Sequence, residues 1–187
     1  MLENKYTKPG LFYRFVHNNI IYVHFFIKID RKNKIFKFIM NYYLRLVNLN
    51  DISEELYNLV NVFTRNKQEY TMEQEIILRK AIMENCNSVC KVYLCFERGS
   101  NKLVGMIKLL LEPKLHNNGA YVGHIEDVAV FPEYRKKGIG KMMVTQVMAL
   151  CKTFGCYKVI LCCNEPLVGF YEDCGFSRKG LELSCYF

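Results

Sequence analysis

The chain has 187 residues, enough for one domain of ordinary size with a substantial core. Hydrophobic residues make up 51% and aromatic residues 14%, which excludes an intrinsically disordered protein. The net charge of +8 is concentrated in residues 1–45, which hold nine Lys/Arg and two Asp/Glu, against 17 and 16 in the remainder. Because the main domain is nearly neutral, the sequence predicts no nucleic-acid partner.

Residues 1–40 form a basic, aromatic N-terminal extension whose role the sequence does not indicate. Its apolar run from Ile20 to Ile29 is interrupted by His24 and Lys28 and is too short to span a bilayer. No signal-peptide cleavage motif follows this run, so we expect no transmembrane segment. The nine cysteines include no C-x-x-C pair and no zinc-ligand spacing. They predict reduced thiols, no metal and a cytoplasmic location.

From residue 41 onward, apolar patterns predict a compact α/β domain. Alternating or β-branched runs predict strands near 42–49, 91–97, 103–112, 122–131 and 157–163, and a last strand after residue 176. Helical spacing predicts helices that start near 51–53, 72 and 138, and Pro166 suits the first turn of a short helix that Gly175 stops. Residues 41–187 are therefore expected to form one domain.

The most informative stretch is Val122–Lys141, VGHIEDVAVFPEYRKKGIGK. An apolar strand ends at Pro132, and a basic loop with two glycines then leads into a helix. Backbone N–H groups at a helix N-terminus, the helix dipole and glycines that allow close approach together form an anion cradle. The loop matches neither the P-loop nor the dinucleotide fingerprint, because it reads R-x-x-G-x-G.

This loop resembles the pyrophosphate-binding loop of the GCN5-related N-acetyltransferase (GNAT) superfamily. Three further blocks resemble the glucosamine 6-phosphate N-acetyltransferase family within it: GHIEDVAV at 123–130, GCYKVIL at 155–161 and VGFYEDCGF at 168–176. The resemblance covers about residues 41–187. It implies a GNAT fold of the α/β (α+β) class, with a mixed central sheet of about six strands and helices on both faces.

The resemblance also implies acetyl transfer from acetyl-coenzyme A to the amine of glucosamine 6-phosphate, a step toward UDP-N-acetylglucosamine. Tyr171 would protonate the coenzyme A thiolate, and Glu126 and Asp127 would grip the sugar amine. The proposed coenzyme contacts are Val128, Ala129, Val130, Arg135, Lys136, Lys137, Gly138, Ile139, Gly140, Cys162, Phe170 and Tyr171. A bulge in the strand that carries Glu126 and Asp127 would open the coenzyme slot.

On the acceptor side the resemblance implies contacts from Thr64, Lys114, His116, Glu126, Asp127, Tyr157 and Lys158. Tyr157 and Lys158 would reach the sugar phosphate of a partner subunit, so the family pattern implies a homodimer with shared active sites. Four positions depart from that pattern. Relatives have a carboxylate at Cys162, Asn at Leu167, Arg at Tyr186 and Gly at Lys136.

Two alternatives stay open at this point. The same fold can acetylate a protein or polyamine amine, although Lys114, His116 and Lys158 favour a small anionic sugar. A non-catalytic coenzyme A-binding module is the other alternative. The departures at Cys162 and Leu167 favour it, whereas the presence of Tyr171 argues against it.

Overall fold

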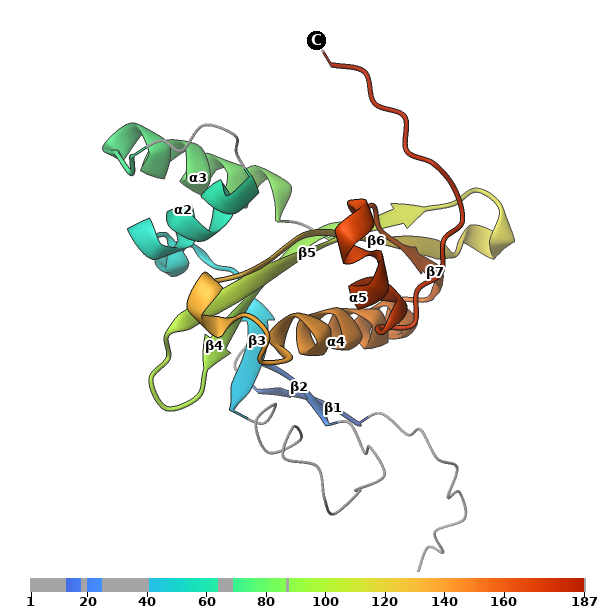
Figure 1. Ribbon diagram of the computed structural model, residues 1–187, viewed down its shortest axis with the longest axis horizontal. Helices are drawn as coiled ribbons and strands as arrows, with labels where there is room; N and C mark the ends of the chain where they lie inside the picture. The colour runs from blue at the N-terminus through green and yellow to red at the C-terminus, as the bar shows by residue number, and fades with distance from the viewer. Residues whose placement is uncertain (1–12, 18–19, 25–40, 64–68, 87, 187) are drawn as a thin grey trace, which may run out of the picture.

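The computed structural model describes residues 13–17, 20–24, 41–63, 69–86 and 88–186. Seven strands form one sheet in the order β1-β2-β3-β4-β5-β6-β7. All neighbouring strands are antiparallel except β6 and β7, which are parallel, so the predicted mixed sheet is confirmed (Figure 1). The strands are β1 (Tyr13–His17), β2 (Ile20–His24), β3 (Tyr42–Leu46), β4 (Cys90–Glu97), β5 (Leu103–Pro113), β6 (Tyr121–Val130) and β7 (Cys156–Ile160).

Helices cover both faces of the sheet, as predicted (Figure 1). On one face α2 packs near α3, and on the other face α4 and α5 lie side by side. Short 3₁₀ turns connect these elements. The helices are α2 (Glu54–Val60), α3 (Met72–Asn85), α4 (Ile139–Thr153) and α5 (Val168–Glu172), and the turns are η1 (Leu49–Asp51), η2 (Asn61–Phe63), η3 (Asn117–Gly119), η4 (Pro132–Tyr134) and η5 (Glu165–Leu167).

The sheet separates two apolar clusters. Beneath α4, the side chains of Met143, Val147 and Leu150 are buried at the spacing that the sequence predicted. Beneath α2, Leu56 and Leu59 are buried against β4, β5 and Ala129 of β6. Because both faces of β5 and β6 are packed, these two strands form the rigid centre from which the site is built.

A bulge interrupts β6 at the position where the family resemblance implied one. Met106 pairs with Ala129 and Lys108 pairs with Glu126, so Asp127 and Val128 together face the single residue Ile107. Asp127 has a φ of 49°, an uncommon backbone conformation for a residue other than glycine. The extra residue breaks the side-chain alternation, which re-aims Asp127 relative to Glu126.

Beyond the bulge, β6 and β7 part from each other. Their parallel pairing runs only from Tyr121–Cys156 to His124–Ile160. The rest of β6, through Val130, is paired with β5 on one side, while β7 has ended on the other. The edge of β6 that faces α4 and α5 is therefore open to a ligand backbone.

Gly105 allows β5 to approach β6 beside this bulge. A Cβ atom at Gly105 would lie 2.6 Å from the Ala129 carbonyl oxygen and 3.3 Å from the Met143 side chain.

We expect Gly105→Ala to lower the free energy of unfolding by about 1–3 kcal/mol, because the backbone oxygen cannot move away at low energetic cost. Denaturant unfolding measures this change. Gly169→Ala is the matched control, because nothing lies within 4 Å of the position that a Cβ would take there. Equal stability of the two variants would contradict the close approach.

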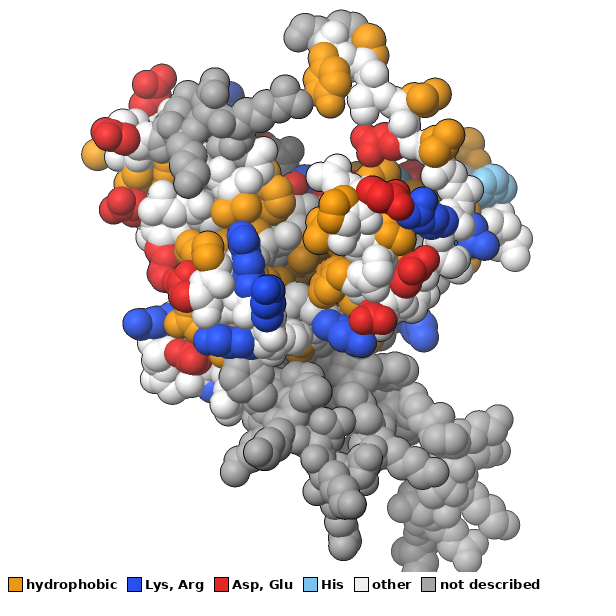
Figure 2. All heavy atoms as spheres, viewed as in Figure 1, with side chains coloured by type: hydrophobic (Ala, Val, Ile, Leu, Met, Phe, Trp, Pro, Cys, Tyr) orange, Lys and Arg blue, Asp and Glu red, His pale blue; other side chains and the backbone are white. Residues whose placement is uncertain are grey.

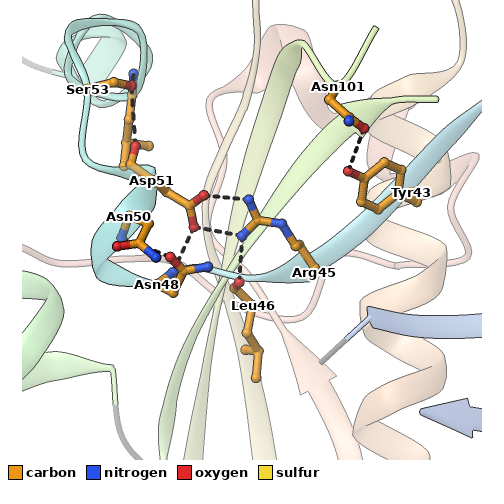
Figure 3. Close-up of polar contacts among 9 residues, drawn as sticks. Tyr43, Arg45, Leu46, Asn48, Asn50, Asp51, Ser53 and Asn101 are labelled. Carbon is orange, nitrogen blue, oxygen red and sulfur yellow. Dashed lines mark hydrogen bonds and ion pairs between the residues drawn. The ribbon is translucent and has the colours of Figure 1, made fainter. Parts of the chain in front are cut away.

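An ion pair fixes β3 to the segment that leads into α2 (Figure 3). Arg45 donates to Asp51 at 2.7 Å through one nitrogen and binds the other carboxylate oxygen through a second. The Arg45 guanidinium also lies 4.3 Å from the centroid of the Phe96 ring. Ser53 then caps α2, which starts where the sequence predicted a helix, by accepting a hydrogen bond from the Leu56 N–H.

Two features at the ends of the chain differ from the expectation. Strands β1 and β2, residues 13–17 and 20–24, extend the sheet at the edge of β3, so part of the N-terminal extension belongs to the sheet. The strand expected after residue 176 is absent from the sheet. Residues 177–186 instead run away from the body as an extended arm, with Leu181, Leu183 and Tyr186 about nine-tenths exposed (Figure 1). The boundary at residue 41 stays a prediction.

Candidate active site

The basic loop forms a cradle at the start of α4. Gly138 is the N-cap with a φ of 78°, and the first intrahelical hydrogen bond runs from the Met142 N–H to the Gly138 carbonyl. The N–H groups of Ile139, Gly140 and Lys141 therefore precede the hydrogen-bonded ladder and are available to an anion. Lys136 has a φ of 57°, so a lysine here adopts the left-handed conformation that glycine adopts at no cost.

Basic side chains surround this cradle. Arg135 is anchored to the end of β6, because its Nε donates to the Val130 carbonyl at 3.0 Å. Lys137 Nζ lies 5.0 Å from the centroid of the Tyr134 ring, and Lys136 is exposed. Figure 2 shows a hollow between the two halves of this face, with apolar side chains in its wall and Lys and Arg side chains beside it. This arrangement suits a ligand with an anionic end and an apolar, extended arm.

The open edge of β6 lies between this cradle and the carboxylates of Glu126 and Asp127. Val128 and Val130 are half-buried against the cluster beneath α4, and Ala129 is buried on the opposite face. This edge can pair with an extended amide-containing arm in the way that a strand would. The open edge, the cradle and the helix N-terminus therefore suit a ligand that combines an amide-containing arm with an anionic group.

Tyr171 is the buried tyrosine of α5 and belongs to the cluster beneath α4. Its side chain is 9% exposed and is held between Phe170 and Phe176, with ring centroids 4.9 and 6.1 Å away. Phe170 in turn lies against Gly140, where an added Cβ would come within 3.3 Å of its ring. Burial, followed by nearby Cys163 and Cys174, raises the pKa of the Tyr171 phenol. The hydroxyl therefore stays protonated at neutral pH and is suited to donate a proton.

Cys162 and Cys163 follow the end of β7, and both are exposed. The sequence predicted a strand near 157–163, but β7 ends at Ile160, before either cysteine, so strand alternation does not set which way the two side chains point. Burial, followed by the carboxylates of Glu182 and Glu126, raises the pKa of Cys162. A thiol with a raised pKa stays protonated at neutral pH.

The neighbouring carboxylate of the arm gives a testable effect on this thiol. We expect Glu182→Gln to make Cys162 react about threefold faster with iodoacetamide near neutral pH, because removal of the negative charge lowers the thiol pKa. Peptide mapping measures the rate, with Cys163 as an internal reference. Glu172→Gln, an exposed position on α5, is the control. An unchanged rate at Cys162 would mean that Glu182 does not lie beside it.

Glu126 and Asp127 carry their carboxylates at the bulge in β6. Glu126 is exposed, and Asp127 accepts a hydrogen bond at 2.8 Å from Lys108 Nζ of β5. The sequence prediction did not include Lys108. Its participation depends on pairing across the bulge, which the sequence does not specify.

Lys114 and His116 lie at the far end of the β5–β6 connection. Lys114 forms an ion pair with Glu112, and His124 Nε2 is 2.8 Å from the same carboxylate. Lys114, followed by His124, lowers the pKa of Glu112. His116 caps no backbone group with its side chain and instead lies 6.3 Å from the Tyr157 ring, centroid to centroid. Strand alternation places Glu112 and His124 on neighbouring positions, but the sequence prediction missed both residues.

Tyr157 and Lys158 complete this second group at the start of β7. The Lys158 Nζ lies 5.7 Å from the centroid of the Tyr157 ring, and both side chains are exposed. Lys158 is beside Val122, four residues along β6 from Glu126, or roughly 13 Å. Within one subunit, the backbone of this group is therefore separated from Glu126 along the sheet. Thr64, which the resemblance also implied, lies outside the described residues.

Within the described residues, no group of three His, Cys, Asp or Glu side chains is placed to hold a metal ion. No helix of the described part is long and apolar enough to cross a membrane. The functional groups that the described residues bring together are a backbone cradle, an open strand edge, a protonated phenol and a carboxylate pair.

A sheet with a bulge and two parted strands, followed by a glycine-bearing loop at a helix N-terminus, is typical of an acyl-coenzyme A-binding fold. Comparison with known proteins agrees. Residues 53–176 match the acetyltransferase (GNAT) family. The chain belongs to this family, whose members use acetyl-coenzyme A as cosubstrate.

Several relatives are glucosamine 6-phosphate N-acetyltransferases. The glucosamine 6-phosphate N-acetyltransferase of Schizosaccharomyces pombe is 44% identical over 87 residues, which cover 46% of this chain and 78% of that protein. The enzyme of the same name from Arabidopsis thaliana is 43% identical over 91 residues, which cover 49% of this chain and 61% of that protein. The crystal structure of an A. thaliana glucosamine-6-phosphate N-acetyltransferase aligns with a TM-score of 0.67 and 32% identity, over 78% of this chain and 98% of that one. The resemblance inferred from the sequence blocks is confirmed.

Proposed function

We propose that this chain transfers the acetyl group of acetyl-coenzyme A to the amine of glucosamine 6-phosphate. The observation that carries the proposal is the burial of one phenol, Tyr171, in the cluster against which Val128 and Val130 of β6 pack, next to Phe170, which lies against Gly140 of the cradle. The names of the relatives supply the acceptor. The product, N-acetylglucosamine 6-phosphate, would feed UDP-N-acetylglucosamine synthesis in the cytoplasm, where all nine cysteines would stay as free thiols.

In the proposed reaction, the amine nitrogen attacks the thioester carbonyl within one ternary complex. Backbone N–H groups of Val128 and Val130 hold the pantetheine arm and stabilise the tetrahedral oxyanion. The carbon–sulfur bond then breaks, and Tyr171 gives its proton to the departing thiolate. The exposed Glu126 carboxylate and water are the remaining acceptors for the amine proton, because the thiol of Cys162 is neutral.

The cosubstrate contacts of the proposal follow the cradle. Arg135, Lys136 and Lys137 provide positive charge, and the N–H groups from Gly138 to Gly140 receive the pyrophosphate. Phe170 packs against Gly140 and keeps the loop next to Tyr171. Cys162 borders the end of this path as a neutral group.

We further propose that the active form is a homodimer in which the C-terminal arms are exchanged. Two observations support this. The arm of residues 177–186 leaves the body with Leu181 and Leu183 exposed, and β7 is the last strand of the sheet, with its outer edge unpaired among the described strands. An extended segment and an open edge are complementary in backbone hydrogen bonding. Exchange of the arms would cover the exposed leucines and the outer edge of β7.

The dimer gives the group at Lys114, His116, Tyr157 and Lys158 a role. These residues lie at the opposite end of the β6–β7 pairing from Glu126, and a two-fold axis can bring them to the partner's acceptor. Their charges, two lysines and a histidine, suit a phosphate. Each site would then combine the carboxylates of one subunit with the cations of the other.

The acceptor is tested by the release of coenzyme A with a panel of amines: glucosamine 6-phosphate, glucosamine, a lysine peptide and a diamine. We expect glucosamine 6-phosphate to give the highest kcat/KM. A faster reaction with the lysine peptide or the diamine would favour a protein or polyamine acetyltransferase. Absence of turnover together with acetyl-coenzyme A binding would favour a non-catalytic module.

A further inference from the structure

Lys108 is a charged side chain of β5 that reaches the bulge. It pairs in register with Glu126, and its Nζ lies 2.8 Å from Asp127 Oδ2. Both side chains of this ion pair are only about one third exposed, 33% for Lys108 and 37% for Asp127. Lys108 therefore places a positive charge against Asp127 and across the strand pair from Glu126, the two carboxylates that the proposed function assigns to the acceptor amine.

The surroundings keep this lysine charged. Partial burial disfavours the ammonium form, but the hydrogen bond and charge of Asp127, with that of Glu126, outweigh it and raise the pKa of Lys108. Cys90 of β4 and Cys86 after α3 also lie near the amine. An ammonium in this place stays charged throughout the physiological pH range.

The charges around the bulge then decide which acceptors fit. Glu126 and Asp127 together carry two negative charges, and Lys108 offsets one of them. An acceptor with one ammonium group balances the remaining negative charge. An acceptor with two ammonium groups would bring an excess positive charge close to Lys108. A phosphate on the acceptor is repelled less by the carboxylates when the Lys108 ammonium offsets part of their negative charge.

We propose that Lys108 is a specificity-determining residue, which selects against acceptors that carry more than one positive charge. The inference rests on the proposed function in one respect, namely that the acceptor amine lies beside Glu126 and Asp127. It goes beyond that function because it names the residue that separates an amino sugar from a diamine. An ordinary surface ion pair would have no such effect.

The test compares two acceptors in the full chain, glucosamine with one amine and 1,4-diaminobutane with two. In Lys108→Met, which keeps the length of the side chain and removes its charge, we expect kcat/KM for the diamine relative to glucosamine to rise about tenfold. The change should fall on KM, with kcat nearly constant. Lys108→Arg should restore the wild-type ratio. Lys102→Met, at the β4–β5 turn, is the matched control and should leave it unchanged.

An unchanged ratio in Lys108→Met would overturn the proposal. The comparison does not use glucosamine 6-phosphate, so a wrong choice of that substrate would show itself separately in the wild-type enzyme. A second measurement needs no turnover. A double-mutant cycle of Lys108→Met and Asp127→Asn in denaturant unfolding should show a coupling between the two residues. A coupling free energy of zero would mean that Lys108 and Asp127 do not interact, and this would contradict the ion pair on which the selectivity depends.

Discussion

Tyr171→Phe should lower kcat by about 10²–10⁴-fold and leave the affinity for acetyl-coenzyme A nearly unchanged. The substitution keeps the ring that packs against Phe170 and Phe176, and it removes only the hydroxyl. Without this proton donor, the thiolate must leave unprotonated or take its proton from water. Steady-state kinetics and a binding titration with coenzyme A measure the two quantities separately.

The control for this variant is Tyr42→Phe. Tyr42 is a buried tyrosine of β3 in the same apolar cluster, and it lies outside the site. The Tyr42→Phe variant tests whether loss of any buried tyrosine hydroxyl lowers kcat as much as loss of the Tyr171 hydroxyl. A kcat of Tyr171→Phe within a few-fold of the control would assign the acid role to another group or to water.

The pH dependence gives a second check on the same residue. Because burial raises the phenol pKa above its usual value of about 10, the proton is present throughout the neutral range. We therefore expect no fall in kcat from the loss of this acid up to a pH of about 9. The fall should begin only as the pH approaches the raised pKa.

Removal of the arm, residues 178–187, should convert the dimer to a monomer and lower kcat/KM for glucosamine 6-phosphate by about 10²-fold. Leu181 and Leu183 of the arm are 95% and 94% exposed, so they bury almost no surface against the described part of their own subunit. Loss of the arm should therefore change the free energy of unfolding of a subunit little. Sedimentation measures the assembly, and the coenzyme A-release assay measures the activity.

Point variants separate strand exchange from general loss of the arm. Leu181→Asp and Leu183→Asp place charges on one row of the extended arm and should weaken the dimer. Ser184→Asp places the same charge on the opposite row and should have the smaller effect, because alternate residues of a strand face opposite sides. A truncated chain that sediments as a fully active monomer would eliminate both the exchange and the shared site.

The centre of the site could be predicted from the sequence because its signals are local. Pro132 ends a strand, two glycines shape a loop, and the spacing of Met143, Val147 and Leu150 specifies one buried helix face. Each of these depends on residues within about one turn or one strand. The structure places these elements as the sequence indicated, with Tyr171 against the loop through Phe170.

The remaining features depend on pairing between distant residues. Lys108 and Asp127 are 19 positions apart, and their contact requires the register across a bulge. The pattern after residue 176 favours an extended conformation, but it does not specify a strand to pair with, and the arm joins no strand of its own sheet. The composition of residues 1–40 suggests an appended basic segment, whereas the backbone of β1–β2 extends the sheet at β3.

The central claim, that this chain acetylates the amine of a phosphorylated amino sugar, is tested most directly by following the acetyl group itself. Acetyl-coenzyme A labelled with ¹³C at the carbonyl is incubated with the full chain and an equimolar mixture of glucosamine 6-phosphate and glucosamine. We expect the label to move from the thioester to an amide carbonyl on the phosphorylated sugar first, as measured by NMR. Label that reaches both sugars at the same rate, or that stays on the thioester, would contradict the claim.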